Sequence, residues 1–320
     1  MTYIKKQRER ESPTQRLFAL ITTLFLFATL FICSVFFSEK LSGYVLEGAA
    51  LAIQRVVPII FPTLILSDLI LHLSAGVRLT SLSRPLSGIC GVKEGCLGVL
   101  LLGLVCGFPA GAKSALDSYK NGIIEKSECE RLMSISNNAS APFVIGVVGC
   151  LLFKSRMLGV MLYLSMVLGA LTTARLTASN VKSLNDYSIC NRINYSFIAS
   201  VRHAAEISVN VIAFISTFYI ISRITVLVVG DGMISALILS FTEISAASSY
   251  ISDLCNFSDL LKILFISFSV GFSGLSAIMQ AVVLAPTNEK FSLYRILFFK
   301  LIQGLITSLY SLILFPIFTF

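Results

Sequence analysis

The stretch GCLGVLLLGLVCGFPAGAK, residues 95–113, decides the fold class because it begins like a membrane helix and then breaks. Pro109 has no backbone N–H, and the glycines lack a Cβ, so a continuous helix is disfavoured. Irregular backbone inside a bilayer must be buried in protein or line a water-filled cavity. The break exposes N–H groups whose dipole favours an anion. We expect an anion-binding site formed by Gly107, Pro109, Gly111 and the cationic Lys113; the alternative is an interfacial turn with a snorkelling lysine.

The composition of the whole chain indicates a polytopic membrane protein. Of 320 residues, 56% are hydrophobic and 13% are charged, about half the ~25% charged share of soluble domains. Mean hydropathy is +0.86. The net charge is +8, but the basic residues lie at segment ends and in loops, as the positive-inside rule expects. No nucleic-acid partner is expected, because that would need a basic patch on a folded polar surface.

The sequence predicts neither a metal site nor a catalytic set. The eight cysteines form no CxxC pair and the chain has two histidines, so the spacing of zinc ligands is missing. Motifs for acyl transfer, zinc proteolysis and phosphate binding are missing too. We therefore expect no enzyme activity and no cofactor, apart from a coupling ion that is either H⁺ or Na⁺.

Uncharged runs predict an all-α protein with about eight or nine membrane segments. Runs of about 20 apolar residues can cross a bilayer as helices, and the bases before the first run place the N-terminus in the cytoplasm. Segments 44–74, 95–112 and 132–153 are interrupted, so whether each crosses fully stays open. The predicted parts are a basic tail at 1–16, a first transmembrane helix at 17–37, a first repeat with one further span at 44–174, a polar connecting loop at 175–202, and a second repeat with the C-terminal span at 203–320.

Residues 95–143 and 231–276 share a pattern that predicts an internal repeat. Each has an apolar run, a break of small residues with one charged or polar group, and a second apolar run broken by small polar residues. Weak internal symmetry with interrupted segments in both halves is typical of secondary transporters. The alternative is that membrane helices resemble one another by composition. We favour two repeated units, each with a broken or re-entrant helical hairpin.

Small polar residues mark further candidate binding positions inside the apolar runs. One group precedes Pro142, and the other surrounds a glycine-rich break in the second half. Such groups can bind a substrate, or they can hydrogen-bond and pack between helices. The candidates are Asn137, Asn138 and Ser140, followed by Gly271, Ser273, Gly274, Ser276 and Gln280.

Ionisable residues within membrane segments are costly and are functional candidates by default. Glu243 is the only charge in 232–251, and it could carry a coupling proton or help to hold Na⁺. The alternative is an ion pair between Glu243 and Arg223 or Arg55.

Two more acids are candidates for ion coupling. Glu206 lies on one helix face with His203 and Asn210, a stripe that suits a transport pathway or an interface. Asp68 is four residues before His72, a spacing that suits a proton relay or a local hydrogen bond.

The motifs resemble those of a known family. VPIIFP at 57–62 with Ser67-Asp68 resembles its V-P-x-L-F-P-F-F…S-E element. Arg84-Pro85-Leu86 followed by GFPAGAK at 107–113 resembles its R-P-L…G-[YF]-P-x-G-A-K core. GFSGLS at 271–276 with Gln280 resembles its G-F-G-G-L-S…Q element, with Asp68 and Ser273 standing where Glu and Gly are usual. The family is the YlbJ-type sporulation integral membrane proteins. They belong to the nucleoside-recognition (Gate) domain group, which is similar to concentrative nucleoside transporters.

The resemblance implies two Gate-like repeats and a role in endospore formation in spore-forming bacteria. It also implies movement of dipicolinic acid across the outer forespore membrane, in connection with the spore cortex. Dipicolinate is a small dianion, which agrees with the anion site expected around Lys113. The expected partners are this solute and the lipid bilayer, and a homo-oligomer stays open. The alternatives are a nucleoside transporter, as the wider group suggests, and a non-transporting membrane scaffold for spore assembly proteins.

Overall fold

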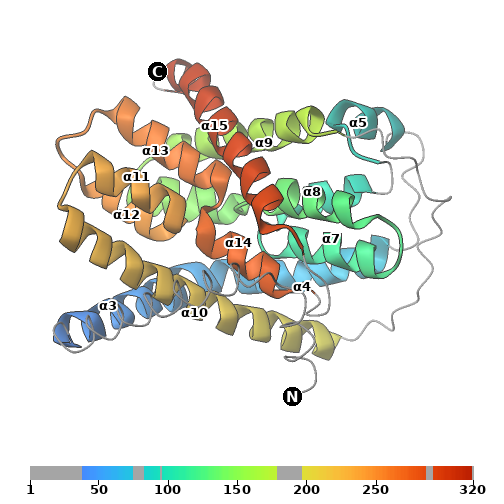
Figure 1. Ribbon diagram of the computed structural model, residues 1–320, viewed down its shortest axis with the longest axis horizontal. Helices are drawn as coiled ribbons and strands as arrows, with labels where there is room; N and C mark the ends of the chain where they lie inside the picture. The colour runs from blue at the N-terminus through green and yellow to red at the C-terminus, as the bar shows by residue number, and fades with distance from the viewer. Residues whose placement is uncertain (1–37, 75–82, 94–95, 179–196, 286–290, 319–320) are drawn as a thin grey trace, which may run out of the picture. The chain divides into compact units, whose positions relative to one another are not determined.

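The computed structural model describes most of the chain and shows regular elements that are all helical over the residues it describes (Figure 1). The all-α prediction is therefore confirmed for that part. Five helices within it are long and apolar enough to cross a membrane, whereas the count of eight or nine segments stays a prediction. The predicted basic tail and first transmembrane helix lie outside the described residues, which are 38–74, 83–93, 96–178, 197–285 and 291–318. For residues 38, 67–74, 83 and 84 the helix is described but not the side chains.

The chain divides into two compact units, residues 1–46 and 47–320. The described part of the first unit is the start of helix α3 (Ser38–Leu51), and the rest of the description concerns the second unit. There α3 leads through a π-helical turn, η1 (Ala52–Val56), into α4 (Val57–Ser74). Segment 44–74, which the sequence predicts to be interrupted, is therefore helical with a local π turn. Such turns are a common cause of irregularity in a helix.

The first half then forms short helices separated by breaks. The helix α6 (Leu97–Val105) ends just before the sequence Cys106–Pro109, and α7 (Ala110–Lys120) follows it. A turn leads to α8 (Lys126–Ser136), and after a second break the chain continues as the π-helix η3 (Pro142–Leu152). The break expected within 95–113 is therefore present.

The second half has a similar order of short helices. The helices α11 (Met233–Thr242) and α12 (Ile244–Asp253) are separated at Glu243. The helices α13 (Asp259–Phe272) and α14 (Gly274–Val283) are separated at Ser273. Ser273 and Gly274 have left-handed φ angles of 71° and 68°, and two such residues in succession stop a right-handed helix.

Long helices surround these short ones: α9 (Arg156–Leu176), α10 (Phe197–Val229) and α15 (Leu293–Phe318), with the short α5 (Ser83–Cys90) against α9. The polar loop predicted at 175–202 is thus helical at both ends. The helix α15 packs along α9 and α13. Thr307 of α15 lies against Gly169 and Gly271, and a Cβ on either glycine would overlap the Thr307 hydroxyl.

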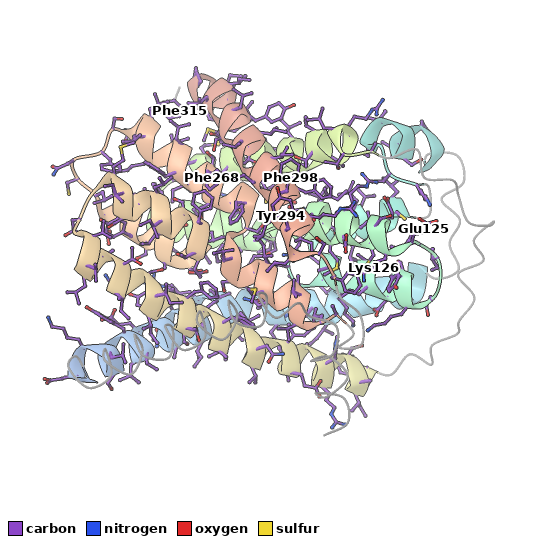
Figure 2. All side chains as sticks on the ribbon, in the orientation of Figure 1. Glu125, Lys126, Phe268, Tyr294, Phe298 and Phe315 are labelled. Carbon is purple, nitrogen blue, oxygen red and sulfur yellow. The ribbon has the colours of Figure 1, made fainter. Side chains whose placement is uncertain are left out.

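The helix α15 is apolar on its exposed side and polar on its buried side, the reverse of a helix on the surface of a soluble protein. Apolar side chains face outward, which suits lipid. Tyr294 and Phe298 stack on this exposed side, whereas Phe268 of α13 lies in the interior with Phe272 and Phe241 (Figure 2). The exposed stripe further along is Leu305, Leu309, Ile313 and Ile317, and the buried stripe is Lys300, Gln303, Thr307 and Ser311.

Candidate functional site

Helix breaks from the two halves of the sequence meet at Asn137 and Asn138. The Asn137 carbonyl accepts a hydrogen bond from Ser273 Oγ at 2.9 Å, and Asn137 Nδ2 donates to the Ala277 carbonyl of α14 at 3.2 Å. The Asn138 carbonyl accepts from the backbone N–H of Phe108 at 2.6 Å. Residues that the sequence marked in three separate segments therefore lie together.

A lysine of α15 lies fully buried at this meeting point. Lys300 has an exposed fraction of 0%. Its Nζ donates to Asn138 Oδ1 at 3.2 Å, to the Gly271 carbonyl at 3.3 Å and to Gln303 Oε1 at 3.0 Å. Gln303 Nε2 in turn donates to Asn138 Oδ1 at 2.6 Å. We call Asn137, Asn138, Gly271, Ser273, Lys300 and Gln303 the junction.

The oxygens that surround Lys300 are all neutral. Within the described part of the chain, Lys300 forms no ion pair with a carboxylate. A buried charge is normally paired or neutralised, because desolvation costs several kcal/mol. When Lys300 is protonated, its charge has no carboxylate partner among these described residues, and an anionic ligand would compensate it.

Several buried polar atoms, in the junction and elsewhere, have no hydrogen-bond partner among the described residues. A buried polar group is rarely left unbonded, so each of these atoms is a point where a ligand group or a water would bond. Ser276 Oγ, by contrast, contacts Gln280 Nε2 at 3.3 Å. The unpartnered atoms are Asn137 Oδ1, Ser140 Oγ, Gln280 Oε1, Ser248 Oγ, Ser269 Oγ and Thr307 Oγ1.

Glycines let the broken helices approach one another closely. Gly107 has a φ of 80°, and a Cβ on it would lie 2.6 Å from the backbone nitrogen of Ser140. A Cβ on Gly111 or Gly103 would overlap the Ser136 carbonyl oxygen, at the end of α8. The observed contacts of Gly107 and Gly111 are therefore packing contacts that hold the break before Pro109 against the break after Ser136.

Glu243 is buried in the break between α11 and α12, with an exposed fraction of 5%. Its Oε2 accepts from the Ala246 N–H at 2.6 Å and so caps α12. Arg223 instead donates to Glu47 at 3.2 Å, and Arg55 is exposed. The alternative that pairs Glu243 with either arginine is wrong for the described conformation.

Gly274 places the two breaks of the second half side by side. A Cβ on Gly274 would lie 3.2 Å from the Cα of Glu243, and its neighbour Ser273 contacts the junction residue Asn137. Glu243 is thus connected to the junction through two consecutive backbone residues.

Lys113 connects α7 to α10. Its Nζ lies 3.0 Å from His203 Nδ1, in a half-buried position. Pro109 precedes α7, and its carbonyl accepts from the Lys113 N–H at 2.9 Å. The part of Lys113 in anion binding stays a prediction, and the cation found at the junction is Lys300.

Of the remaining acidic candidates, only Glu206 has a described side chain, and it lies apart from the junction contacts. Glu206 is 65% exposed and its Oε1 is 3.6 Å from Arg202 Nε, a pair on the surface of α10. The side chain of Asp68 lies outside the described residues. Their parts in ion coupling stay predictions.

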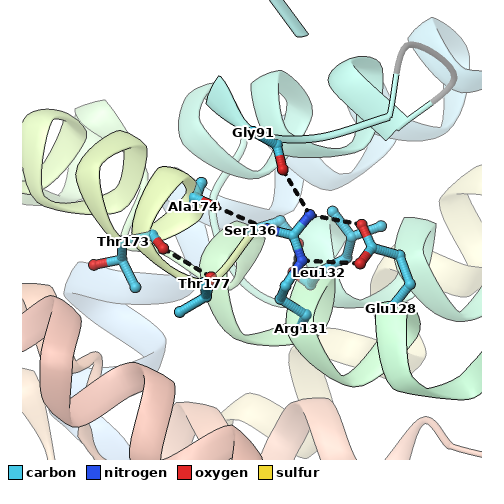
Figure 3. A network of polar contacts seen from close by, with 8 residues as sticks. All are labelled: Gly91, Glu128, Arg131, Leu132, Ser136, Thr173, Ala174 and Thr177. Atoms are coloured by element: carbon cyan, nitrogen blue, oxygen red, sulfur yellow. Dashed lines mark hydrogen bonds and ion pairs between the residues drawn. The ribbon is translucent and has the colours of Figure 1, made fainter. Parts of the chain in front are cut away.

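The charged stretch 114–131, which its composition predicts to be interfacial or solvated, contains a buried ion pair. Arg131 donates to both oxygens of Glu128, at 2.9 and 2.7 Å. It also donates to the Ala174 carbonyl of α9 at 2.9 Å and to the Gly91 carbonyl after α5 at 3.0 Å (Figure 3). The expectation is wrong here, because the guanidinium fork can satisfy a carboxylate and two helix-end carbonyls at once.

Sequence reasoning missed Lys300 and Gln303. Lys300 is the only charge in 296–320, which is the same signal that marked Glu243. The segment resembled a simple C-terminal span because no proline, glycine cluster or polar run interrupts it near the lysine. Within the described residues no three His, Cys, Asp or Glu side chains gather as metal ligands.

Comparison with known proteins finds one informative relative. The chain is 25% identical over 350 aligned positions to the sporulation integral membrane protein YlbJ of Bacillus subtilis (strain 168), and the alignment covers 94% of this chain and 83% of the relative. This similarity confirms the resemblance to YlbJ-type proteins. No family model matches, and no solved structure matches. Together with its long apolar helices, the similarity supports a multi-pass integral membrane protein.

Proposed function

We propose that this protein is a secondary transporter with a membrane role in sporulation, and that it moves a small anionic solute through the junction. The similarity to a sporulation integral membrane protein supports the cellular setting. Dipicolinate is the preferred substrate, the outer forespore membrane the preferred location, and spore cortex formation the process served. These three choices come from the family resemblance, and the choice of an anionic substrate also agrees with the charge of protonated Lys300 in the junction.

The observation that carries the proposal is the buried ammonium of Lys300, held by neutral oxygens where the helix breaks meet. A charged group at this depth in a membrane protein is a functional candidate by default. A carboxylate about 4 Å from the ammonium, at an effective dielectric constant of about 20, would be attracted by about 4 kcal/mol. That corresponds to almost a thousandfold in Kd, so an anion gains far more from this site than a neutral solute.

The order of helices supports a carrier rather than a scaffold. In each half, short helices with two breaks precede one long helix, α9 in the first half and α15 in the second. Carriers with this organisation bind solute where discontinuous helices meet and move one repeat against the other. The proposal therefore includes a structural repeat, in which the two halves of the chain are related units that move against each other.

Uptake by reconstituted vesicles tests the proposal. Labelled dipicolinate should accumulate with the unaltered protein. Lys300→Met should lower uptake by about a hundredfold or more, because it removes the charge at nearly constant volume. Lys300→Arg keeps the charge and should retain part of the activity. The matched control is Lys120→Met, at the exposed end of α7. Uptake by Lys300→Met equal to that of the control would refute the role of the junction.

The unpartnered acceptors favour a nucleoside as the second candidate. Asn137 Oδ1 and Gln280 Oε1 are buried acceptors that receive no hydrogen bond from the residues the structure describes, which would suit ribose hydroxyls or base N–H groups. Uridine or adenosine should then compete for the site where dipicolinate does not, and Lys300→Met should change nucleoside uptake little. A scaffold predicts a third result, namely transport-inactive variants that still support sporulation.

A further inference from the structure

The geometry at Lys300 resembles a cation-coordination site in which the cation is part of the chain. Its ammonium has three hydrogen-bond donors, and three oxygens accept from it at 3.0 to 3.3 Å. They come from three places: the break after α8, the end of α13, and α15 itself. The three oxygens together satisfy every donor of the lysine.

The kinds of oxygen matter. Gly271 is the penultimate residue of α13, and the chain leaves the helix at Ser273, so its carbonyl has lost the donor that a continuing helix would provide. The other two oxygens are side-chain amides, from Asn138 and Gln303. Unwound carbonyls and half-helix C-terminal ends are the groups that coordinate Na⁺ in carriers with broken helices, and oxygen atoms, carbonyl and amide oxygens among them, are the ligands that hard cations take.

We propose that the Lys300 ammonium occupies the place of a coupling Na⁺, so that solute binding and transport by this protein need no sodium. This inference rests on the proposed transport function and specifies its ion coupling. While it is protonated, the tethered ammonium cannot leave with the solute, and the chain itself supplies the charge that an external ion would bring. It also keeps the break after α8 bonded to the end of α13.

A purely structural role for Lys300 makes a different prediction. A lysine that only bridges helices would leave no cation-specific site when it is removed. If it replaces an ion, its removal should leave an oxygen cluster that Na⁺ can fill, provided that the new side chain leaves room. Alanine leaves room, whereas methionine fills most of the volume of lysine without a charge.

The test measures thermal unfolding of the purified full-length protein without solute, in NaCl, KCl and choline chloride at equal ionic strength. The unaltered protein should have the same midpoint in all three salts. Lys300→Ala should have a midpoint that rises with NaCl concentration and not with choline chloride, because a ligand that binds the native state stabilises it. Lys300→Met is the matched control and should show no difference between the salts.

Three results would overturn the proposal. The first is an unfolding midpoint of the unaltered protein that depends on sodium. The second is a Lys300→Ala protein that is equally stable in NaCl and choline chloride, and the third is a Lys300→Ala protein that folds in none of the salts while Lys300→Met folds. A final measurement compares dipicolinate uptake by the unaltered protein in NaCl and choline chloride, where equal rates are expected. Absence of uptake in both salts, with the salt responses as expected, would refute the transport function and leave the assignment of the cation place intact.

Discussion

Replacing Gly103 by alanine should separate the broken helices of the first half. Gly103 lies in α6 against the end of α8, and a Cβ on it would overlap the Ser136 carbonyl oxygen and lie 2.7 Å from both the carbonyl carbon and the Cβ of Ser136. Since carbon atoms pack at about 3.5 to 4.0 Å, α6 would have to move away by about 1 Å. The obstacle is mostly backbone and cannot rotate out of the way.

The magnitude follows from the cost of overpacking. Forcing an extra carbon into a packed interior costs about 1 to 3 kcal/mol. The matched control is Gly98→Ala in the same helix, where no heavy atom lies within 4 Å of the new Cβ. There alanine should stabilise α6 by about 1 kcal/mol. Gly103→Ala gains the same helix propensity, which cancels in the comparison, so the two variants should differ by about 1 to 3 kcal/mol in the free energy of unfolding.

Denaturant unfolding of both purified variants in the same detergent measures this difference. A second readout is uptake, because Ser136 directly precedes the junction residue Asn137, and a shift of α6 relative to α8 should disturb the bond between Phe108 and Asn138. Equal stability of Gly103→Ala and Gly98→Ala would refute the close packing of α6 on α8 and with it the described position of the break.

Two further outcomes are expected. Arg131→Leu should destabilise the protein by about 3 to 5 kcal/mol, because it leaves Glu128 buried without its cation. The control is Arg202→Gln, at an exposed pair, which should change stability little. Equal effects of the two variants in denaturant unfolding would contradict the buried network. Lys113→Ala should reduce dipicolinate uptake if the charge near the first break guides the anion, with Lys120→Ala of the same helix as control; unchanged uptake would remove Lys113 from the mechanism.

The helix breaks could be predicted because their causes are local. Pro109, with glycines on both sides, disfavours a helix whatever surrounds it. The polar residues from Asn137 to Ser140 stand out against apolar neighbours, as does the charge of Glu243. Each of these signals lies within a few residues of the feature that it marks.

Which residues meet could not be predicted, because contacts between distant segments leave no local signal. Lys300 and Asn138 are separated by 162 positions in the chain. A partner of Lys113 is a histidine 90 positions away, and the lysine that contacts Asn138 is Lys300, which the sequence did not mark. The Glu128–Arg131 pair shows a related limit, since a short charged stretch has the same composition whether it faces water or is enclosed by α5 and α9.

The junction argues for function because stability alone does not require it. Burying an ammonium costs several kcal/mol, and its hydrogen bonds return about 1.5 to 3 kcal/mol each, so together they do little more than offset that cost. An apolar residue at position 300 could pack against α13 without that cost, as the outward stripe of α15 shows for the lipid side. The lysine instead lies where breaks from both halves meet, and the junction residue Asn137 has an acceptor, Oδ1, with no donor in the described part of the chain. A protonated lysine in that place makes physical sense if a negatively charged solute comes to neutralise its charge.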